Sequence, residues 1–351
     1  MIFARRANPD AYLPEDWDSA WARGWFRMRQ HLFTTHFLGF DRGFFSAVWL
    51  RVDLGRWIRD KKFETLRKAN KTFELEFRRM DARGPRIEQE LLYQKYRRSL
   101  AFEPAPTLRD LLFGEERRTV FPTWEVNLYD GELIGSGIFD VGGQAAGGIV
   151  CFYDPDYRKH SLGKYLIYAK MDWCRARELD WFYPGYVAPG QPRFDYKLGL
   201  AAEAIEYLEL STGLWRRLRP GSVPDPLRDM RDRLHLLISV MDDHGVSARL
   251  VRYRHIDINL NPQVQGLGLF DYPLFVECFP GVSPIPALVI VYDPRDGLYQ
   301  LLRCRSIHHF GGNGLEDDVF FSDLLVTEPT LVSSANPEEM AEWLTRIRIM
   351  A

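Results

Sequence analysis

The chain has 351 residues, of which 46% are hydrophobic and 27% charged, and its 46 Lys and Arg residues nearly balance 48 Asp and Glu residues. This composition is typical of globular proteins and excludes a disordered or fibrous chain. At about 100–200 residues per domain, the length predicts two or three domains. The net charge of −2 gives the molecule as a whole no polyanion-binding character.

The cysteine and histidine spacings indicate no metal or cofactor site. The chain contains four cysteines: Cys151, Cys174, Cys278 and Cys304. No two of them have CxxC spacing, so we expect reduced thiols in a cytoplasmic protein, without zinc, an iron–sulfur centre or a disulfide framework. The pairs His31/His36 and His308/His309 have the wrong spacing to share a metal. No signal peptide and no run of about 18 apolar residues is evident.

Residues 1–110 are expected to form a basic N-terminal domain. A strand is predicted at 47–54 and helices at 60–70 and 86–98, followed by a connector at 99–122. The segment 51–98 holds 15 Lys and Arg against 8 Asp and Glu, a net charge of +7. A solvated helix face and a footprint for a phosphate backbone are the two interpretations of this run.

Residues 111–219 are expected to form an α/β domain, because short strands alternate with helical patterns there. The predicted elements are strands at 125–128 and 133–139 around the turn Asp130-Gly131, a Gly/Ala-rich turn at 142–148, a strand at 148–153, a helix at 165–177 and a strand at 181–186.

Residues 220–351 are expected to form a smaller α+β unit. Asp225-Pro226 is a good helix start, since proline is favoured in the first turn. The predicted elements are a helix from there to about 243, strands at 247–258, 286–293, 298–304 and 319–326, and a final helix from Asn336-Pro337. The role of this unit is unknown, and only its position suggests acceptor or partner docking.

The most informative stretch runs from Tyr153 to Tyr196. Asp154-Pro155 ends a strand, and the string Arg-Lys-His-Ser-Leu-Gly at 158–163 opens a helix. The free N–H groups and positive dipole of a helix N-terminus favour an anion. The residues expected to hold a phosphate are Arg158, Lys159, Ser161 and Gly163. An ordinary helix start capped by Ser161 is the alternative. The P-loop, HExxH, GxSxG and GxGxxG strings are absent.

This stretch resembles the acyltransferase fold of the GNAT superfamily, with Ser161 in place of the first glycine of its phosphate loop. More narrowly, it is similar to the C-terminal half of the arginyl-tRNA–protein transferases. Four motifs carry the resemblance in the family's order: Tyr153-Asp154-Pro155, Ser161-Leu162-Gly163-Lys164-Tyr165, Tyr183-Pro184-Gly185-Tyr186 and Tyr196-Lys197. The implied fold class is α/β (α+β), a GNAT-like mixed sheet with flanking helices.

The N-terminal half shows a fainter likeness in Leu50-Arg51-Val52, in the basic stretch 67–70, and in Leu92-Tyr93-Gln94-Lys95-Tyr96. The basic run lies where this family contacts tRNA, which assigns the tRNA backbone to Arg51, Lys61, Lys62, Arg67, Lys68 and Lys71. The chain departs from the family at Pro184, where leucine is usual, and lacks both the methionine before Tyr196 and the N-terminal cysteine cluster. In that family the cysteine cluster can hold a metal or iron–sulfur centre, so its absence here predicts that no such cofactor is bound.

The implied activity is transfer of an amino acid, with arginine as the candidate, from aminoacyl-tRNA to the free α-amine of a protein or peptide. Tyr186 and Tyr196 are expected to line the acyl or amine pocket and relay a proton, although core packing is an equal alternative. Lys197 is expected to pair with an acidic side chain or a phosphate, or else to be a surface lysine. Asp140 or Asp195 is expected to bind a cationic aminoacyl group or act as a base, or else to serve a turn.

Two other functions fit the same residues. An acyl-CoA-dependent N-acyltransferase would hold the CoA pyrophosphate on the same loop, but leaves the basic run without a role. A catalytically silent protein of this fold would bind tRNA or peptide only.

Overall fold

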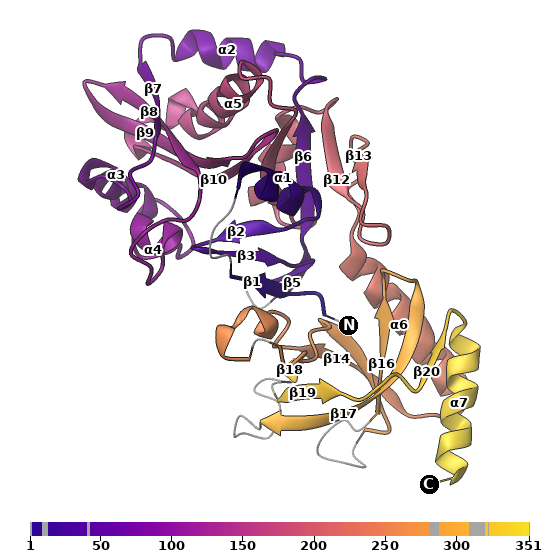
Figure 1. The fold of residues 1–351 in the computed structure, drawn as a ribbon. Helices are drawn as coiled ribbons and strands as arrows, with labels where there is room; N and C mark the ends of the chain where they lie inside the picture. The colour runs from indigo at the N-terminus through magenta and orange to yellow at the C-terminus, as the bar shows by residue number, and fades with distance from the viewer. Residues whose placement is uncertain are drawn as a thin grey trace.

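The structure is a computed structural model that describes residues 2–8, 13–40, 43–264, 266–280, 288–308, 320–321 and 323–350. Figure 1 shows two parts, a larger one built on a mixed sheet with helices around it and a smaller one that holds the C-terminus. The expected mixed α/β architecture, with a GNAT-like sheet and flanking helices, is confirmed. Within the described ranges, no helix has the length and apolarity needed to cross a membrane.

The larger part is organised by an eight-stranded sheet in the order β13-β12-β6-β11-β10-β9-β8-β7. Its strands are β6 (Val48–Asp53), β7 (Glu74–Arg79), β8 (Thr123–Asp130), β9 (Glu132–Val141), β10 (Ala145–Tyr153), β11 (Trp181–Val187), β12 (Ile205–Leu208) and β13 (Trp215–Arg217). All neighbours are antiparallel except β10 and β11, which run parallel. Helix α5 (Leu162–Arg175) makes the crossover between these two strands.

Helices cover both faces of this sheet. Val126 of β8 packs in one apolar cluster with α5 residues such as Leu166, while its neighbours Glu125 and Asn127 contact Gln89 of α3 (Ile87–Arg97). Because alternate residues of a strand point to opposite faces, α5 and α3 lie on opposite sides. Helix α2 (Lys61–Ala69) lies beside α5, and α4 (Leu108–Leu112) beside α3.

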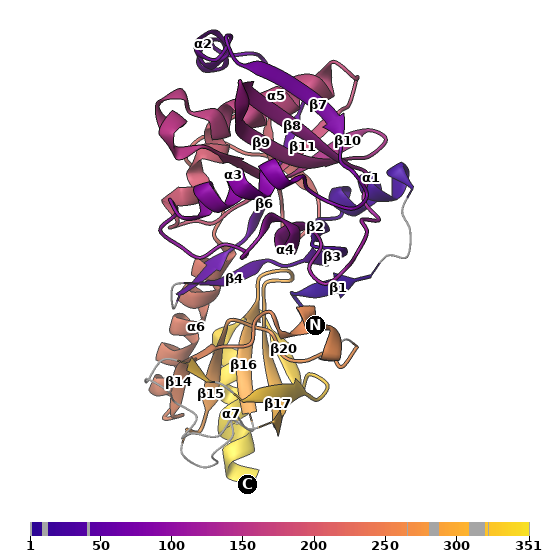
Figure 2. The same cartoon turned by 90° about the vertical axis from the view of Figure 1, so that its left-hand side faces the viewer.

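The first 46 residues form small elements against this sheet. These are α1 (Pro14–Ala22), the three-stranded sheet of β1 (Arg5–Ala7), β2 (Phe26–Met28) and β3 (His31–Thr34), and the hairpin of β4 (Phe37–Phe40) and β5 (Gly43–Ser46). Trp17 and Trp21 of α1 are buried against Phe121 and Tyr183. In Figure 2 the three-stranded sheet lies between the two parts of the molecule.

The C-terminal part pairs a second sheet with two helices, α6 (Pro226–Asp243) and α7 (Pro337–Met350). The sheet has the order β18-β14-β15-β16-β17-β19, with β20 also on β17. Its strands are β14 (Ala248–Tyr253), β15 (Leu274–Cys278), β16 (Leu288–Asp293), β17 (Leu298–His308), β18 (Phe320–Phe321), β19 (Leu324–Thr327) and β20 (Val332–Ser334). Leu234, Leu237 and Met340 from the helices are fully buried against it.

The long elements occur where the sequence predicts them, and the short ones were missed. The Gly/Ala-rich stretch 142–148 is only in part a turn, since β10 begins at Ala145, and the connector 99–122 contains α4. The elements β1–β5, β7, β12, β13, β15, β20 and α1 were not predicted. Residues 286, 287, 319 and 322 of two predicted strands and His309 lie outside the described residues.

The central sheet takes strands from both sides of residue 110, because β6 and β7 lie in it with β8–β13. The division at residue 110 into a basic domain and an acyltransferase domain therefore stays a prediction.

A buried carboxylate joins the start of the chain to the C-terminal part. Asp271 Oδ2 accepts hydrogen bonds from the backbone amides of Phe3 and Ala4 at 2.8 and 2.9 Å, and from Asn259 Nδ2 at 3.2 Å. Its other oxygen has no hydrogen-bond partner among the described residues. Burial raises the pKa of Asp271 to about 6, and the hydrogen bonds oppose this only in part.

The raised pKa of Asp271 predicts a stability that falls as pH rises. Protonation favours the folded state, so this contribution is fully present below pH 4 and is lost as pH passes about 6. Relative to Asp271→Asn, which keeps an acceptor oxygen, we expect the wild-type free energy of unfolding to fall by up to about 3 kcal/mol between pH 4 and pH 7. Urea unfolding of both proteins across this range measures the difference, and parallel pH profiles would contradict the assignment.

Candidate active site

The site forms where the two parallel strands separate. The β10–β11 pairing covers Ala145–Trp181, Ala146–Phe182 and Gly147–Tyr183 and ends there. On the other side of β11, the register with β6 shifts between Phe182 and Gly185. Pro184 lies at this point and has no N–H to donate to either neighbour, and Gly185 follows with φ +91°, a conformation that glycine adopts without strain.

Two cavities meet at this separation. The first has a volume of about 480 Å³ and the second about 290 Å³. Four residues line both: Gly148 and Ile149 of β10, Pro184 of β11, and Lys197. The first cavity extends to the start of α5, whereas the second is largely aromatic, with Trp21, Phe26, Phe33, Trp49, Tyr186 and Phe194. A molecule in one cavity would therefore meet a molecule in the other at the backbone of β10.

The backbone of β10 is irregular at the meeting point. Its register with β9 runs from Gly148–Phe139 directly to Val150–Ile138, so Ile149 is an extra residue. Such a bulge leaves backbone groups outside the ladder. Ile149 lines both cavities, and its peptide group is a candidate to bind an oxyanion, which backbone N–H groups stabilise well in a water-poor site.

The start of α5 is open to an anion. Ser161 occupies the N-cap position in a left-handed conformation (φ 51°, ψ 41°), but its side chain accepts no capping hydrogen bond, and the first turn has no acidic residue. Ser161 therefore has the N-cap position that the alternative predicts, but it does not form the predicted capping hydrogen bond. A Cβ on Gly163 would lie 3.2 Å from Tyr153 Cε1, which explains the small residue there.

Of the residues predicted to bind phosphate, Arg158, Ser161 and Gly163 line the first cavity and Lys159 does not. Arg158 and Lys159 are both exposed on the short 3₁₀ helix η1 (Pro155–His160) that precedes α5. Lys164, which we did not single out, adds a further positive charge to the lining.

Lys197 is the buried cation between the two cavities. It lies on the 3₁₀ helix η2 (Pro192–Gly199), is 8% exposed, and donates from Nζ to the carbonyl of Tyr186 at 2.6 Å. The ring centroids of Tyr186 and Phe194 lie 5.1 and 5.2 Å from Nζ. Burial lowers the pKa of Lys197 to about 8, so it can exchange a proton near neutral pH. The surface-lysine alternative is wrong.

The tyrosines divide between the cavities. Tyr186 lines the second, where its ring packs edge-on against Trp49 at 5.1 Å, and burial raises its pKa. Tyr196 lines the first and is 44% exposed. Tyr96 and Tyr153, which we did not assign, line the same cavity with ring centroids 5.2 Å apart. Tyr96 belongs to the family motif Leu92–Tyr96 in α3, and this motif is the feature of the sequence from which its place in the site could have been predicted.

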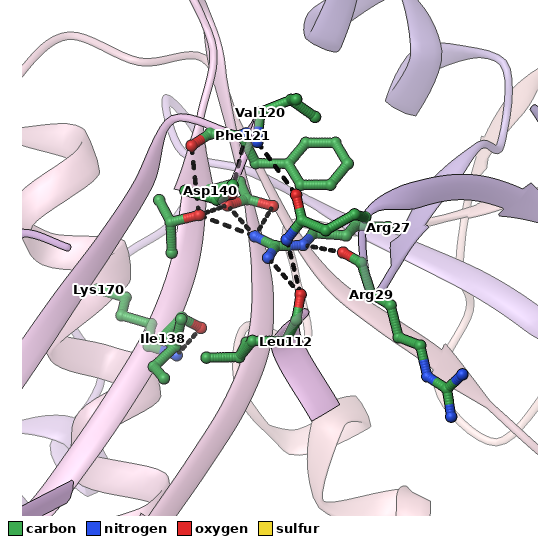
Figure 3. A network of polar contacts seen from close by, with 11 residues as sticks. Arg27, Arg29, Leu112, Val120, Phe121, Ile138, Asp140 and Lys170 are labelled. Atoms are coloured by element: carbon green, nitrogen blue, oxygen red, sulfur yellow. Dashed lines mark hydrogen bonds and ion pairs between the residues drawn. The ribbon is translucent and has the colours of Figure 1, made fainter. Parts of the chain in front are cut away.

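Asp140 lines the second cavity and is buried in a network of polar contacts (Figure 3). Arg27 Nη1 donates to its Oδ1 at 2.9 Å, and Thr123 Oγ1 donates to the same oxygen at 2.7 Å. Arg27 also donates to the carbonyls of Leu112 and Arg29 at 2.8 and 2.6 Å. Burial raises the pKa of Asp140, and Arg27 and Thr123 oppose the rise. Arg27 thus occupies the place that a cationic aminoacyl group would take.

Asp195 is exposed on η2 and lines neither cavity. The structure therefore does not bring it together with the other residues expected to act in catalysis. Its position in the first turn of η2 fits the turn role instead.

Sequence analysis missed a second buried lysine. Lys170 of α5 is 1% exposed, lines the first cavity, and donates to the carbonyls of Ile138 at 2.9 Å and Val150 at 3.1 Å. Burial lowers its pKa, and Cys151 and Asp140 oppose this. A lysine in an amphipathic helix carries no signal of burial by itself.

The residues assigned to the tRNA backbone form two groups. Arg51 Nη2 forms an ion pair with Glu206 Oε2 at 2.6 Å, and its Cζ lies 3.6 Å from the ring centroid of Trp181, so its guanidinium already has partners within the protein. Arg67 Nη2 forms an ion pair with Glu64 Oε2 at 2.9 Å. The other four are exposed and make no ion pair with any described residue: Lys61, Lys62, Lys68 and Lys71. They lie on α2 and just after it.

The C-terminal end of α2 packs against the segment that precedes α5. Asn70, the C-cap of α2, donates from Nδ2 to the carbonyl of His160 at 3.2 Å, and the rings of Phe73 and His160 lie 5.2 Å apart. Lys71, which follows Asn70 in the chain, therefore lies near the segment 158–163 that leads into α5.

Among the described residues, no group of three or more His, Cys, Asp or Glu side chains could hold a metal. The expectation that the protein needs no metal cofactor stays a prediction.

A scan of protein families matches residues 88–205 to the C terminus of the arginine-tRNA-protein transferases. The predicted resemblance is thereby confirmed over this segment.

Curated relatives are similar to part of this chain. The aspartate/glutamate leucyltransferase of Leptospira interrogans is 28% identical over 154 residues, which are 42% of this chain and 58% of the relative. The arginyl-tRNA–protein transferase 1 of Saccharomyces cerevisiae is 29% identical over 93 residues, 26% of this chain and 18% of the relative. The chain thus spans less than two thirds of the length of these relatives.

Among solved structures, L-PGS from Bacillus licheniformis aligns with a TM-score of 0.31 and 14% identity, over 49% of this chain and 50% of that one.

The network of Asp140 predicts a loss of stability rather than a specific loss of substrate binding. Asp140→Ala leaves the 4%-exposed Arg27 side chain without its carboxylate, and breaking a buried ion pair in this way costs about 3–5 kcal/mol. Urea unfolding of the variant and the wild type measures this. A variant of unchanged stability that no longer reacts with one donor would instead make Asp140 a substrate-binding residue.

Proposed function

We propose that this chain transfers an amino acid from aminoacyl-tRNA to the free α-amine of a protein or peptide. The observation that carries the proposal is the meeting of two cavities at the β10 bulge, one of which begins at the open N-terminus of α5. The phosphates and 3′ end of tRNA would bind at Arg158, Ser161 and Lys164, and the acceptor would enter through the aromatic cavity.

The reaction needs no covalent enzyme intermediate. The amine nitrogen attacks the ester carbonyl, the new C–N bond forms, and the bond to the ribose oxygen breaks. The proton that the amine loses ends on that oxygen, and Lys197 Nζ and the Tyr196 hydroxyl are lining groups that can carry it. Alignment of the two reactants can supply roughly 7–11 kcal/mol of the barrier.

The lining residues favour an apolar donor over the arginine that the resemblance suggests. The first cavity has no acidic lining residue, and Asp140 in the second is paired with Arg27. A guanidinium would therefore find no available carboxylate among the described lining residues. Ile149, Val150 and Ile167 offer contacts to an aliphatic side chain such as that of leucine. The Leptospira relative is named a leucyltransferase.

Lys197 favours an acidic residue at the acceptor's N-terminus. Its ammonium has three donors and, among the described residues, one hydrogen-bond acceptor, the carbonyl of Tyr186. A carboxylate of the acceptor would satisfy the remaining donors and offset the cost of burying the charge. The same relative is named for aspartate and glutamate acceptors.

A transfer assay tests the proposal. Purified protein is incubated with a mixed pool of charged tRNAs and peptides that start with Asp, Glu, Arg or Ala, and peptide masses are read. We expect a mass gain of one leucine-class residue on the Asp and Glu peptides. Lys197→Met should lower transfer to the Asp peptide at least about tenfold, because a charged hydrogen bond is worth about 1.5–3 kcal/mol, and should affect the Ala peptide less.

The other outcomes separate the alternatives. Arginine gain would overturn the donor assignment and keep the transferase. No gain with tight tRNA binding would indicate a silent binder, and retention on a CoA resin with no tRNA binding would indicate an acyl-CoA enzyme.

The lysines of α2 predict salt-dependent tRNA binding. Lys68→Glu with Lys71→Glu should weaken tRNA affinity at least about tenfold and reduce the slope of log K against log salt by about two, because each phosphate contact releases counterions. Filter binding at several salt concentrations measures both quantities. The matched control is Arg303→Glu with Arg346→Glu, an equal charge change in the C-terminal part, and an equal loss there would indicate only net charge.

A further inference from the structure

We propose that Lys170 is a positioning residue that holds the bulge of β10 in the shape that faces the two cavities. Lys170 reaches the bulge from the side of α5. Its Nζ donates to the carbonyl of Ile138 on β9 at 2.9 Å and to that of Val150 on β10 at 3.1 Å. Figure 3 shows the contact with Ile138 beside the network of Arg27 and Asp140.

The two carbonyls belong to the residue pair that resumes the ladder after the bulge. Phe139 pairs with Gly148, and Ile138 pairs with Val150, so Ile149 is the residue left over. A bulge disrupts the ladder locally and leaves backbone groups in need of other partners. One ammonium bridges the two strands at this position, and so fixes where the extra residue lies.

The sheet leaves room for this lysine. A Cβ on Gly137 of β9 would lie 2.7 Å from Lys170 Cε, 3.1 Å from its Nζ and 3.0 Å from Val126 Cγ1. Any side chain at residue 137 would therefore displace the end of the Lys170 side chain and press on that of Val126. The absence of a side chain at Gly137 therefore provides the space that the Lys170 side chain occupies against the sheet.

Burial disfavours the charged form of Lys170, and the neighbouring Cys151 and Asp140 favour it. Within the described residues, no carboxylate lies within ion-pair distance of its Nζ, and a buried ammonium is costly to keep. The bulge that it holds lines both cavities, where the ester carbonyl would develop negative charge. Lys170 would thus set the position of the backbone donors and contribute a positive potential beneath them. This last step rests on the proposed function, whereas the bulge itself does not.

Hydrogen exchange of Lys170→Met tests the inference without any substrate. Methionine keeps much of the apolar stem but removes the ammonium. We expect amides of the peptide that covers residues 145–153 to exchange at least tenfold faster, while peptides from α3 keep their protection. In the transfer assay, kcat should fall at least tenfold with KM for aminoacyl-tRNA changed less than twofold, because the donor site at α5 is retained.

Two further variants make the test specific. Tyr168→Phe removes another hydrogen bond from α5, that of the Tyr168 hydroxyl to the carbonyl of Gly199 at 3.3 Å, and Tyr168 lines neither cavity. It should leave exchange at 145–153 unchanged. Gly137→Ala should reproduce the local signature of Lys170→Met by displacing the lysine, and serves if the methionine variant does not fold.

Exchange at 145–153 that stays at the wild-type rate in both Lys170→Met and Gly137→Ala would overturn the inference. Faster exchange along the whole of α5, equally in Tyr168→Phe, would also overturn it by making Lys170 an ordinary core contact. Faster local exchange in a protein whose wild type transfers no amino acid would refute the proposed function and keep the positioning role.

Discussion

The separation of β10 and β11 is the constraint on which the rest of the site depends. Parallel strands in a sheet normally continue together, and here their pairing ends at Gly147 and Tyr183. Pro184 cannot donate to a ladder, and Gly185 takes a conformation that other residues avoid, so the sequence of β11 itself ends the pairing. The resulting opening joins the two cavities, exposes the bulge of β10, and places Lys197 where both reactants would reach it.

Positive charge in this protein serves two different purposes, and only the partners distinguish them. Arg27 and Arg51 stabilise the interior through Asp140 and Glu206, each far away in the sequence. Lys68 and Lys71 remain exposed on α2 and just after it. The net charge of +7 over residues 51–98 does not distinguish arginines in internal ion pairs from exposed lysines, because a net charge contains no information about the partner of each side chain.

The sequence was sufficient for the long elements and for the order of the motifs, since α5, α6 and β8–β11 have clear periodicity or turn signals. It was insufficient for short strands such as β12 and β13, whose pairing depends on β6. Arg158, Ser161 and Gly163 do meet Tyr196 and Lys197 in the first cavity, whereas Asp140 lies in the second cavity paired with Arg27 and Asp195 lines neither. Lys170 escaped notice because its burial results from Gly137 on another strand, and no local pattern records that contact.

The position of β6 has a consequence for how the chain folds. This strand pairs with β11 and β12, and its Arg51 is bonded to Glu206, 155 residues later. On a ribosome, β6 emerges long before either of its neighbours, so one edge stays unpaired until about residue 187 has been made and the other until about residue 208. Contacts over such separations are slow to form, and unpaired apolar strands are prone to aggregate. Expression of this protein should therefore depend on chaperones that shield the first half of the chain, and shortened chains that end before β12 should be insoluble.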